Sequence, residues 1–251
     1  MEVNLVLSGG AAKGFAHIGT LIALEELGFK IRAISGVSAG AIVGSYYLAG
    51  YSPQEMLKLI SSTPWAKLFR PSFPKKSLIG LGKIEQYLRE TLNKNTFEEL
   101  NGKLYISALD LRSASVITFS SGELIKPLLG SFAIPGIFEP VAFRNALLVD
   151  GGIVNNLPIE PILGEKPCIC VDVTAISEVS NPTNIFSVLI RSFNAILKHT
   201  YQSKKIQCDI LIEPDLRSFS MLGLKDAQRI TQVGYLASIR AIKSWLECQK
   251  R

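Results

Sequence analysis

The sequence predicts an α/β protein in which a parallel sheet carries helices on its outside. Residues 3–7 form a short apolar run that ends in Ser-Gly-Gly, which is typical of a buried strand leading into a tight loop. Apolar residues then recur at helical spacing as far as Gly28, and a second strand at 31–35 leads into a helix at 39–49. This alternation of strand and helix is the usual pattern of a parallel sheet.

The later part of the chain continues the alternation. We expect helices at 53–61, 83–93, 186–197 and 224–247, and strands near 103–109, 115–119, 145–149, 168–174 and 209–213. Residues 62–82 are irregular and rich in proline and glycine. No stretch has the composition of a linker, so we predict a single domain over residues 1–251, with residues 62–82 as a lid or cap.

Composition narrows the classes of protein that fit. The chain has 251 residues, of which 47% are hydrophobic and 19% charged, as in ordinary globular proteins. We find no signal peptide and no apolar run long enough to span a bilayer, so we expect a cytoplasmic protein. The net charge of +6 permits an anionic membrane surface as a partner, such as the inner membrane surface. No zinc-finger spacing or RNA-recognition signature indicates nucleic acid.

The four cysteines are expected to be buried, reduced thiols. Cys168 and Cys170 stand two apart in a strand-like run, so both should point to one face of the sheet. A metal site would need more ligands nearby, and the chain has only two histidines.

A serine stands on a cramped turn between the second strand and the helix that follows it. Gly36-Val37-Ser38-Ala39-Gly40 matches the pattern G-x-S-x-G. Small neighbours let a strained strand-to-helix turn close, and the helix directs free N–H groups and its positive end toward the serine. We therefore expect Ser38 to be an exposed nucleophile. The alternative is an ordinary tight turn, because so short a pattern also arises by chance.

A second glycine-rich loop, Ser8–Gly14, also joins a strand to a helix. It lacks the Ser or Thr that follows the lysine of a P-loop, and no acidic residue ends the next strand as dinucleotide binding would require. Its successive backbone N–H groups are typical of an anion-binding turn. If the first two strands are neighbours, this loop lies beside Ser38, where an oxyanion would need donors.

An aspartate followed by two glycines, Asp150-Gly151-Gly152, ends a later strand. By default it is a turn residue, and the functional alternative is a general base for the serine. The order Ser38, Asp150, His199 also matches α/β-hydrolases, although His199 closes an amphipathic helix and the serine turn comes early for that fold. His17 lies inside the first helix, where we expect a packing or surface role, with a local role at the nearby glycine loop as the alternative.

Together, Gly9–Gly14, Gly36–Gly40 and Asp150–Gly152 resemble, in this order, the motifs of the patatin-like phospholipase family. That family carries a glycine-rich oxyanion loop, a G-x-S-x-G nucleophile and an aspartate in D-G-G or D-G-A. Residues 131–141, SFAIPGIFEPV, also resemble the segment before the family's aspartate. The likeness runs from about residue 3 to about residue 175.

The resemblance implies a three-layer α/β/α sandwich with a mostly parallel central sheet, and a Ser–Asp dyad that needs no histidine, metal or cofactor. Ser38 would be the nucleophile and Asp150 its base, which must be desolvated and close to the serine because an aspartate at its usual pKa of about 3.9 is a weak base. The remaining residues carried over are Gly9, Gly10 and Ala11 as oxyanion donors, with Lys13, Gly14, Gly36, Gly40, Gly151 and Gly152 in support. Ala11 departs from the family's usual glycine, and alanine fits only if φ there is not positive.

The activity expected from this resemblance is hydrolysis of lipid carboxylic esters, of the lysophospholipase or phospholipase A type, through an acyl-Ser38 intermediate. The substrate would be a phospholipid or a lysophospholipid. No EF-hand-like acidic loop indicates a calcium requirement. Two alternatives stay open: a Ser-Asp-His esterase of small esters, and a non-catalytic lipid-binding module that regulates another protein.

Cations and aromatic side chains alternate in residues 65–83, which contain no acidic residue. This composition suits contact with an anionic lipid surface, and it equally suits a cap whose aromatic side chains pack on the core while its cations stay solvated. The residues expected at a membrane surface are Trp65, Phe69, Phe73, Lys75 and Lys76.

Overall fold

The sheet is built around two buried strands from the N-terminal part of the chain. The computed structural model describes residues 1–63, 68, 70–71, 79–165, 167–174, 188, 191–192, 195, 202–221 and 223–249. Within these residues β1 (Glu2–Leu7) pairs in parallel with β2 (Lys30–Val37), and α1 (Phe15–Glu26) connects them. The predicted neighbourhood of the first two strands is therefore confirmed.

Eight strands form the main sheet, in the order β10-β9-β1-β2-β5-β8-β7, with β6 paired to β5. The strands from β10 to β5 run parallel, and the pairs that β5 makes with β6 and β8, and that β8 makes with β7, are antiparallel. The remaining strands are β5 (Lys103–Asp110), β6 (Ser115–Phe119), β7 (Val141–Phe143), β8 (Ala146–Asp150), β9 (Cys168–Val171) and β10 (Ile210–Ile212). A short separate pair joins β3 (Arg70–Pro71) to β4 (Ile79–Gly80).

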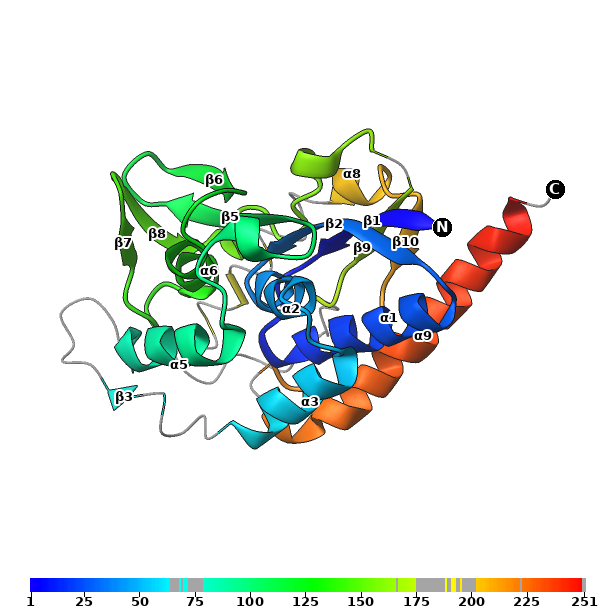
Figure 1. Ribbon diagram of the computed structural model, residues 1–251, viewed down its shortest axis with the longest axis horizontal. Coiled ribbons are helices and arrows are strands. Elements are labelled where there is room, and N and C mark those ends of the chain that lie inside the picture. The colour runs from blue at the N-terminus through cyan, green and yellow to red at the C-terminus, as the bar shows by residue number, and fades with distance from the viewer. Residues whose placement is uncertain are drawn as a thin grey trace.

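Helices cover both faces of the sheet, as Figure 1 shows. One layer contains α1, α2 (Ala39–Leu48), α3 (Pro53–Ser62) and the long α9 (Ala227–Cys248), with α5 (Gly82–Leu92) and α6 (Ile125–Phe132) beside them. The opposite layer contains, among the described residues, the short helices η4 (Glu160–Ile162) and α8 (Gln202–Lys205). The predicted three-layer α/β/α sandwich with a mostly parallel sheet is confirmed.

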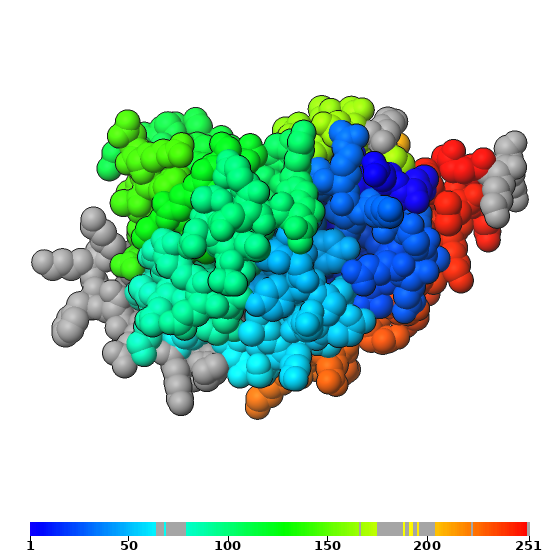
Figure 2. Space-filling view, in the orientation of Figure 1, coloured from blue at the N-terminus to red at the C-terminus, as the bar shows by residue number. Residues whose placement is uncertain are grey.

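The alternation of side chains along β1 divides the core between these layers. Leu5 and Leu7 belong to the large cluster under α1 and α2, whereas Val6 packs with Leu157 and Ile162 in the smaller cluster on the other face. In the space-filling view the residues of α1–α3 and of α5 meet in one continuous surface, and the end of α9 projects beyond it (Figure 2). No described helix is long and apolar enough to cross a bilayer.

The register of β5 brings two distant parts of the chain together. Val37 at the end of β2 pairs with Ser107, and Asp150 at the end of β8 pairs with Ala108, the next residue of β5. The strands β2 and β8 thus pair with successive stretches of β5. The residue after β2 and the last residue of β8 therefore lie next to each other.

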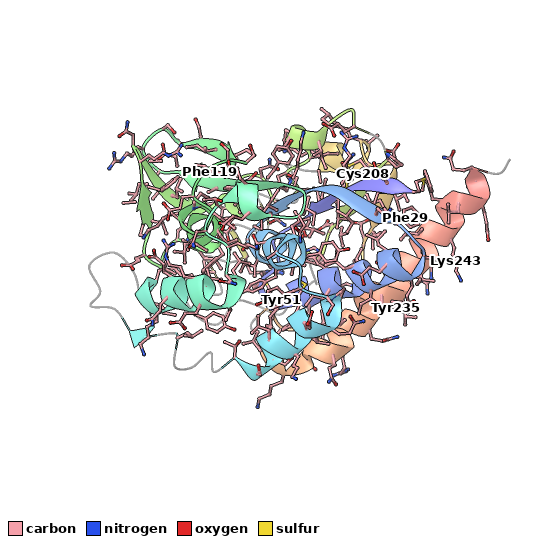
Figure 3. All side chains as sticks on the ribbon, in the orientation of Figure 1. Phe29, Tyr51, Phe119, Cys208, Tyr235 and Lys243 are labelled. Atoms are coloured by element: carbon pink, nitrogen blue, oxygen red, sulfur yellow. A yellow bond between two sulfur atoms is a disulfide. The ribbon has the colours of Figure 1, made fainter. Side chains whose placement is uncertain are left out.

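The prediction of reduced thiols is wrong for two cysteines. Cys170 of β9 and Cys208, which lies beside α8 in Figure 3, form a disulfide between residues 38 positions apart. Cys168 and Cys170 do share one face, as predicted, because both pack in the smaller cluster. The sequence could not reveal the pairing, since it depends on β9 and β10 being adjacent strands.

Candidate active site

Ser38 occupies the sharp turn between β2 and α2. Its backbone has φ 53° and ψ −122°, a conformation that a residue with a Cβ adopts only under strain. Glycine is required on both sides: a Cβ at Gly40 would collide with the Leu7 carbonyl, and one at Gly36 would lie 2.8 Å from the Gly40 carbonyl oxygen. The strained strand-to-helix turn expected from the sequence is therefore present.

The Ser38 hydroxyl forms a hydrogen bond with the Asp150 carboxylate. Asp150 is 5% exposed, and burial raises the pKa of its carboxyl to about 6. Hydrogen bonds from Ser38 and from the Gly152 N–H, 2.7 Å from Oδ1, oppose this rise because they stabilise the charged form. Asp150 is therefore both a turn residue and a buried carboxylate in contact with the serine.

A segment that sequence reasoning had not assigned a role holds both residues in place. Ser131, near the end of α6, accepts a hydrogen bond from the Ser38 N–H at 2.9 Å and donates one to the Ser107 carbonyl at 2.7 Å. Two residues later, the Ala133 carbonyl accepts a hydrogen bond from the Asp150 N–H at 3.0 Å. The only signal in the sequence was the family-like stretch 131–141, because α6 itself was not predicted.

The glycine-rich loop lies against Ser38, as expected. A Cβ at Gly9 would be 3.1 Å from the Ser38 Cβ, and one at Gly14 would be 2.6 Å from the Ala39 Cβ, so the absence of side chains permits this approach. Within the described part of the chain, the N–H groups of Gly9, Gly10 and Ala11 have no acceptor. The loop thus offers three backbone donors, and the first of them, at Gly9, lies against the serine.

Two details of the site differ from expectation. Ala11 has φ 50°, so the condition under which alanine was expected to fit is not met, and the loop carries strain of about 1–2 kcal/mol there. Ser38 is 7% exposed and not open to solvent, because the turn is packed under the glycine loop and against Ser131.

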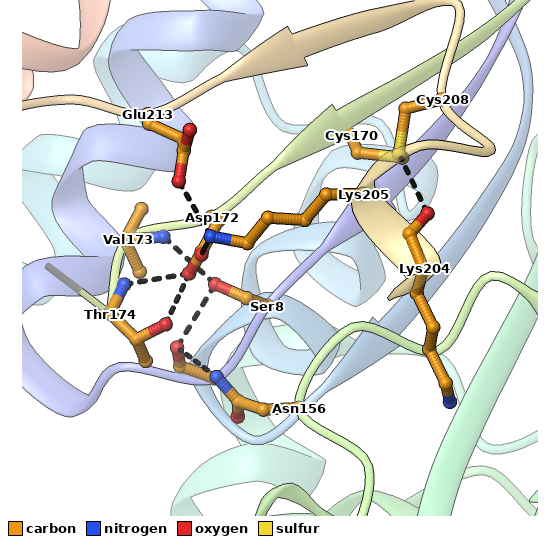
Figure 4. Close-up of polar contacts among 11 residues, drawn as sticks. Ser8, Asn156, Cys170, Asp172, Val173, Thr174, Lys204, Lys205, Cys208 and Glu213 are labelled. Carbon is orange, nitrogen blue, oxygen red and sulfur yellow. Dashed lines mark hydrogen bonds and ion pairs between the residues drawn. A yellow bond between two sulfur atoms is a disulfide. The ribbon is translucent and has the colours of Figure 1, made fainter. Parts of the chain in front are cut away.

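Lys13 lies behind the glycine loop in a charged environment. Burial lowers the pKa of its ammonium group, while the nearby carboxylates of Asp172 and Asp215 raise it. Figure 4 shows the adjoining network, in which Lys205 of α8 forms ion pairs of 2.6 Å with both Asp172 and Glu213. Lysine and carboxylate side chains at the ends of β9 and β10 therefore lie close to one another beside the glycine loop.

Several predicted residues lie outside the described residues. These are His199 and the expected membrane-contact residues Trp65, Phe69, Phe73, Lys75 and Lys76, together with most of the 62–82 lid. The returning end of that segment is anchored. The Ile79 N–H donates to the Ile137 carbonyl at 2.8 Å, the Ile79 carbonyl accepts from the Glu139 N–H at 3.2 Å, and the Leu81 N–H donates to the Glu139 carboxylate at 2.8 Å. Across the described ranges, no three acidic, histidine or cysteine side chains gather as metal ligands would.

Comparison with known proteins agrees with this geometry. The model of the patatin-like phospholipase family matches residues 5–163, which include the glycine loop, Ser38 and Asp150. The chain belongs to this family. Patatin-like relatives include an NTE family protein of Mycobacterium tuberculosis, 32% identical over 183 residues, which are 72% of this chain and 51% of the relative. Lysophospholipase NTE1 of Candida albicans is 27% identical over 93% of this chain and 18% of its own length.

Solved structures support the patatin-like fold. The crystal structure of VipD from Legionella pneumophila superposes with a TM-score of 0.64 at 16% identity, over 96% of this chain and 66% of that one. ExoU from Pseudomonas aeruginosa, in complex with SpcU, gives 0.53 at 16% identity over 97% of this chain and 52% of its own. The chain thus spans about half the length of the mycobacterial relative and a smaller share of the fungal one.

Proposed function

We propose that this chain is a serine hydrolase of lipid carboxylic esters, of the lysophospholipase or phospholipase A type, acting through Ser38 and Asp150. The observation that carries the proposal is the hydrogen bond between the strained Ser38 and the buried Asp150 carboxylate. Membership of the patatin-like phospholipase family supports a lipid ester as the substrate class, and the name of the fungal lysophospholipases favours a lysophospholipid.

The reaction would begin with proton transfer from the Ser38 hydroxyl to Asp150. The serine oxygen attacks the ester carbonyl carbon, and the resulting oxyanion accepts hydrogen bonds from the N–H groups of Gly9, Gly10 and Ala11. Asp150 then returns the proton to the departing alcohol, which leaves an acyl-Ser38. Asp150 next takes a proton from a water molecule, which attacks the acyl carbon. The bond to Ser38 Oγ breaks, Asp150 returns the proton to Oγ, and the fatty acid leaves.

The environment of Asp150 suits this role. A carboxylate with a pKa of about 6 is a stronger base than an ordinary aspartate and is still ionised at neutral pH. Every group in the scheme belongs to the chain, so it needs no metal or cofactor. We further propose that residues 1–251 act as one domain and that the 65–83 segment contacts the lipid surface.

Turnover of a lipid substrate tests the proposal. Fatty acid release from a lysophospholipid is measured for the wild type and for Ser38→Ala, Asp150→Asn and His199→Ala. We expect Ser38→Ala and Asp150→Asn to lose at least about 10³-fold in kcat, as removal of members of a nucleophile–base unit does, and His199→Ala to stay close to wild type.

The same measurement separates the rival functions. Loss of activity in His199→Ala with retention in Asp150→Asn would show a histidine-dependent esterase. A folded wild type that releases no fatty acid and binds the lysophospholipid would show a lipid-binding module.

A further inference from the structure

Two buried side chains outside the dyad contact the carbonyl groups of the glycine loop. We propose that His17 and Asn156 are positioning residues that aim the backbone N–H groups of Gly9 and Gly10 at the oxyanion. The inference rests on the proposed hydrolase activity and assigns to that site two residues that never touch the reacting atoms.

His17 fixes the first peptide of the loop. It is fully buried in α1, and its Nε2 lies 2.8 Å from the Ser8 carbonyl oxygen. A carbonyl only accepts, so Nε2 carries the proton and donates. Burial lowers the pKa of His17 to about 4, so the ring is neutral at physiological pH, and Nδ1 has no partner among the described residues. A buried nitrogen without a hydrogen-bond partner lowers the stability of the folded state, so packing alone would favour an apolar side chain here. The only described polar contact of His17 is with this loop.

Asn156 fixes the second peptide. It is 3% exposed, and its Nδ2 donates to the Gly9 carbonyl oxygen at 3.4 Å. The Ser8 hydroxyl also donates to this carbonyl, at 3.0 Å, and accepts from the Val173 N–H, as Figure 4 shows. The Gly9 carbonyl is therefore held from two sides.

Asn156 also lies against the turn that carries Asp150. A Cβ placed on Gly9 or on Gly152 would be 2.6 Å from the same atom, the Asn156 Oδ1. The amide is thus wedged between the oxyanion loop and the Asp150 turn. The side chain of its neighbour Asn155 contacts Lys204 at 2.7 Å and Glu160 at 3.0 Å, and the Asn155 N–H donates to the Gly151 carbonyl at 2.9 Å, which holds the backbone next to Asn156.

Because the peptide bond is planar, a contact that fixes a carbonyl group also fixes the direction of the next N–H group. The carbonyl of one residue and the N–H of the next lie in one plane and point in opposite directions. Holding the Ser8 carbonyl toward His17 therefore sets the direction of the Gly9 N–H. Holding the Gly9 carbonyl toward Asn156 sets that of the Gly10 N–H. Without these contacts glycine peptides could rotate, because glycine restricts φ and ψ least.

The test compares ligands that do and do not form an oxyanion. An alkyl trifluoromethyl ketone forms a tetrahedral adduct with Ser38, whereas an ether-linked lysophospholipid analogue binds without reacting. Wild type, His17→Leu and Asn156→Ala are measured for kcat, KM, ketone inhibition and analogue affinity. Loss of one oxyanion donor costs about 10²–10³ in kcat, so a misaimed donor should cost about tenfold to 10²-fold. We expect kcat and ketone affinity to fall by such a factor, with KM and analogue affinity changed less than about twofold.

Matched control variants distinguish the orientation of the loop N–H groups from the stability of the fold. Thr20→Val removes a buried polar group of α1 one turn from His17, and Asn4→Leu removes a buried asparagine donor at the other end of β1. Both should lower the unfolding midpoint and leave the ratio of ketone to analogue affinity unchanged. His17→Gln, whose amide can reach the Ser8 carbonyl, should recover most of kcat. If His17→Leu does not fold, His17→Asn, with a shorter reach, replaces it.

Each outcome decides the matter. Equal losses of ketone and analogue affinity, or the selective loss in Thr20→Val as well, overturn the positioning role while the hydrolase stands. Unchanged kcat in both His17→Leu and Asn156→Ala does the same. A wild type that neither turns over ester nor binds the ketone overturns the proposed function and this inference with it.

Discussion

At the scale of residues, the proposed site contains a carboxylate whose pKa the fold raises. Asp150 lies at the end of β8 with its side chain buried, and desolvation outweighs the two hydrogen bonds that favour its charged form. The burial that would make Asp150 a stronger base also lowers the stability of the folded state when the carboxyl is ionised. Both effects can be measured.

The pH dependence of kcat/KM should show the basicity of Asp150. Because the base acts only when ionised, we expect the rate to fall as pH decreases through about 6, the pKa of Asp150. A pH profile measured with a soluble ester checks this. An acidic limb near 4 would mean that Asp150 is not desolvated during catalysis.

The free energy of unfolding should show how much the ionised, buried Asp150 destabilises the folded state. The folded pKa of Asp150 lies above its unfolded value, so the folded state binds more protons between pH 4 and 6 and stability falls as pH rises through that range. Asp150→Asn removes the charge and should therefore be more stable than wild type at pH 8, by up to about 3 kcal/mol, with no difference below pH 4. Chemical denaturation at both pH values measures it.

Asp110 offers a control of opposite sign. The Leu147 N–H and the Ser113 side chain hold the pKa of its carboxyl down to about 2, so Asp110→Asn should lose stability at pH 8. Destabilisation of Asp150→Asn at pH 8 would contradict the account of its burial.

At the scale of elements, the β2–α2 turn and the glycine loop fit together only because specific glycines remove side chains. We expect Gly40→Ala to cost more than about 2 kcal/mol of stability and to abolish activity, because its Cβ would meet the backbone of Leu7 in the central strand. Gly82→Ala is the control. No atom lies within 4 Å of the added Cβ, and alanine should stabilise α5 relative to glycine by up to about 1 kcal/mol. Thermal unfolding of both variants tests this, and a Gly40→Ala enzyme as stable as wild type would contradict it.

The sequence predicted those elements whose pattern is local. Runs and spacing of apolar residues predicted α1, α2 and most strands, and Ser52 with Pro53 marked the start of α3. The structure adds a capping box between Ser52 and Glu55 there. The helix α6 was missed because Pro127 and Gly130 interrupt its pattern. The contact of Ser38 with Asp150 could be inferred only by resemblance, since it depends on β2 and β8 pairing with adjacent residues of β5.

The contacts that hold the dyad and the loop could not be read from the sequence. Ser131, His17 and Asn156 act through backbone groups, and their side chains have no spacing that signals such a role. For His17 the sequence favoured a packing or surface role and kept a local role at the glycine loop as the alternative. Its burial against the Ser8 carbonyl follows from how η1 (Ala11–Gly14) continues into α1.

At the scale of the whole molecule, the layer of η4 and α8 is tied to the sheet by a disulfide and by ion pairs. Cys170 and Cys208 join β9 to the turn after α8, whose lysines reach Glu160, Asp172 and Glu213. This layer also carries the Asn155–Asn156 segment. Loosening of this layer should therefore shift Asn156 relative to the glycine loop.

Removal of the disulfide should destabilise the oxidised protein. Closing a loop of 38 residues is worth about 4 kcal/mol at most through the entropy of the unfolded chain. We expect the Cys170→Ala, Cys208→Ala double variant to lose about 2–4 kcal/mol, and a dithiol reductant to do the same to wild type. Cys248→Ser, at an exposed cysteine outside the bond, is the control. A reductant without effect on the wild-type midpoint would contradict the bond.

The proposed pairing of Ser38 with Asp150 can be tested by labelling the nucleophile at a series of pH values. A fluorophosphonate reacts with an activated serine, and peptide mass spectrometry locates the adduct. We expect one adduct, on Ser38, at a rate that rises with pH through about 6, falls sharply in Asp150→Asn and is unchanged in His199→Ala. An adduct on another residue, or labelling that needs His199 and not Asp150, would contradict it.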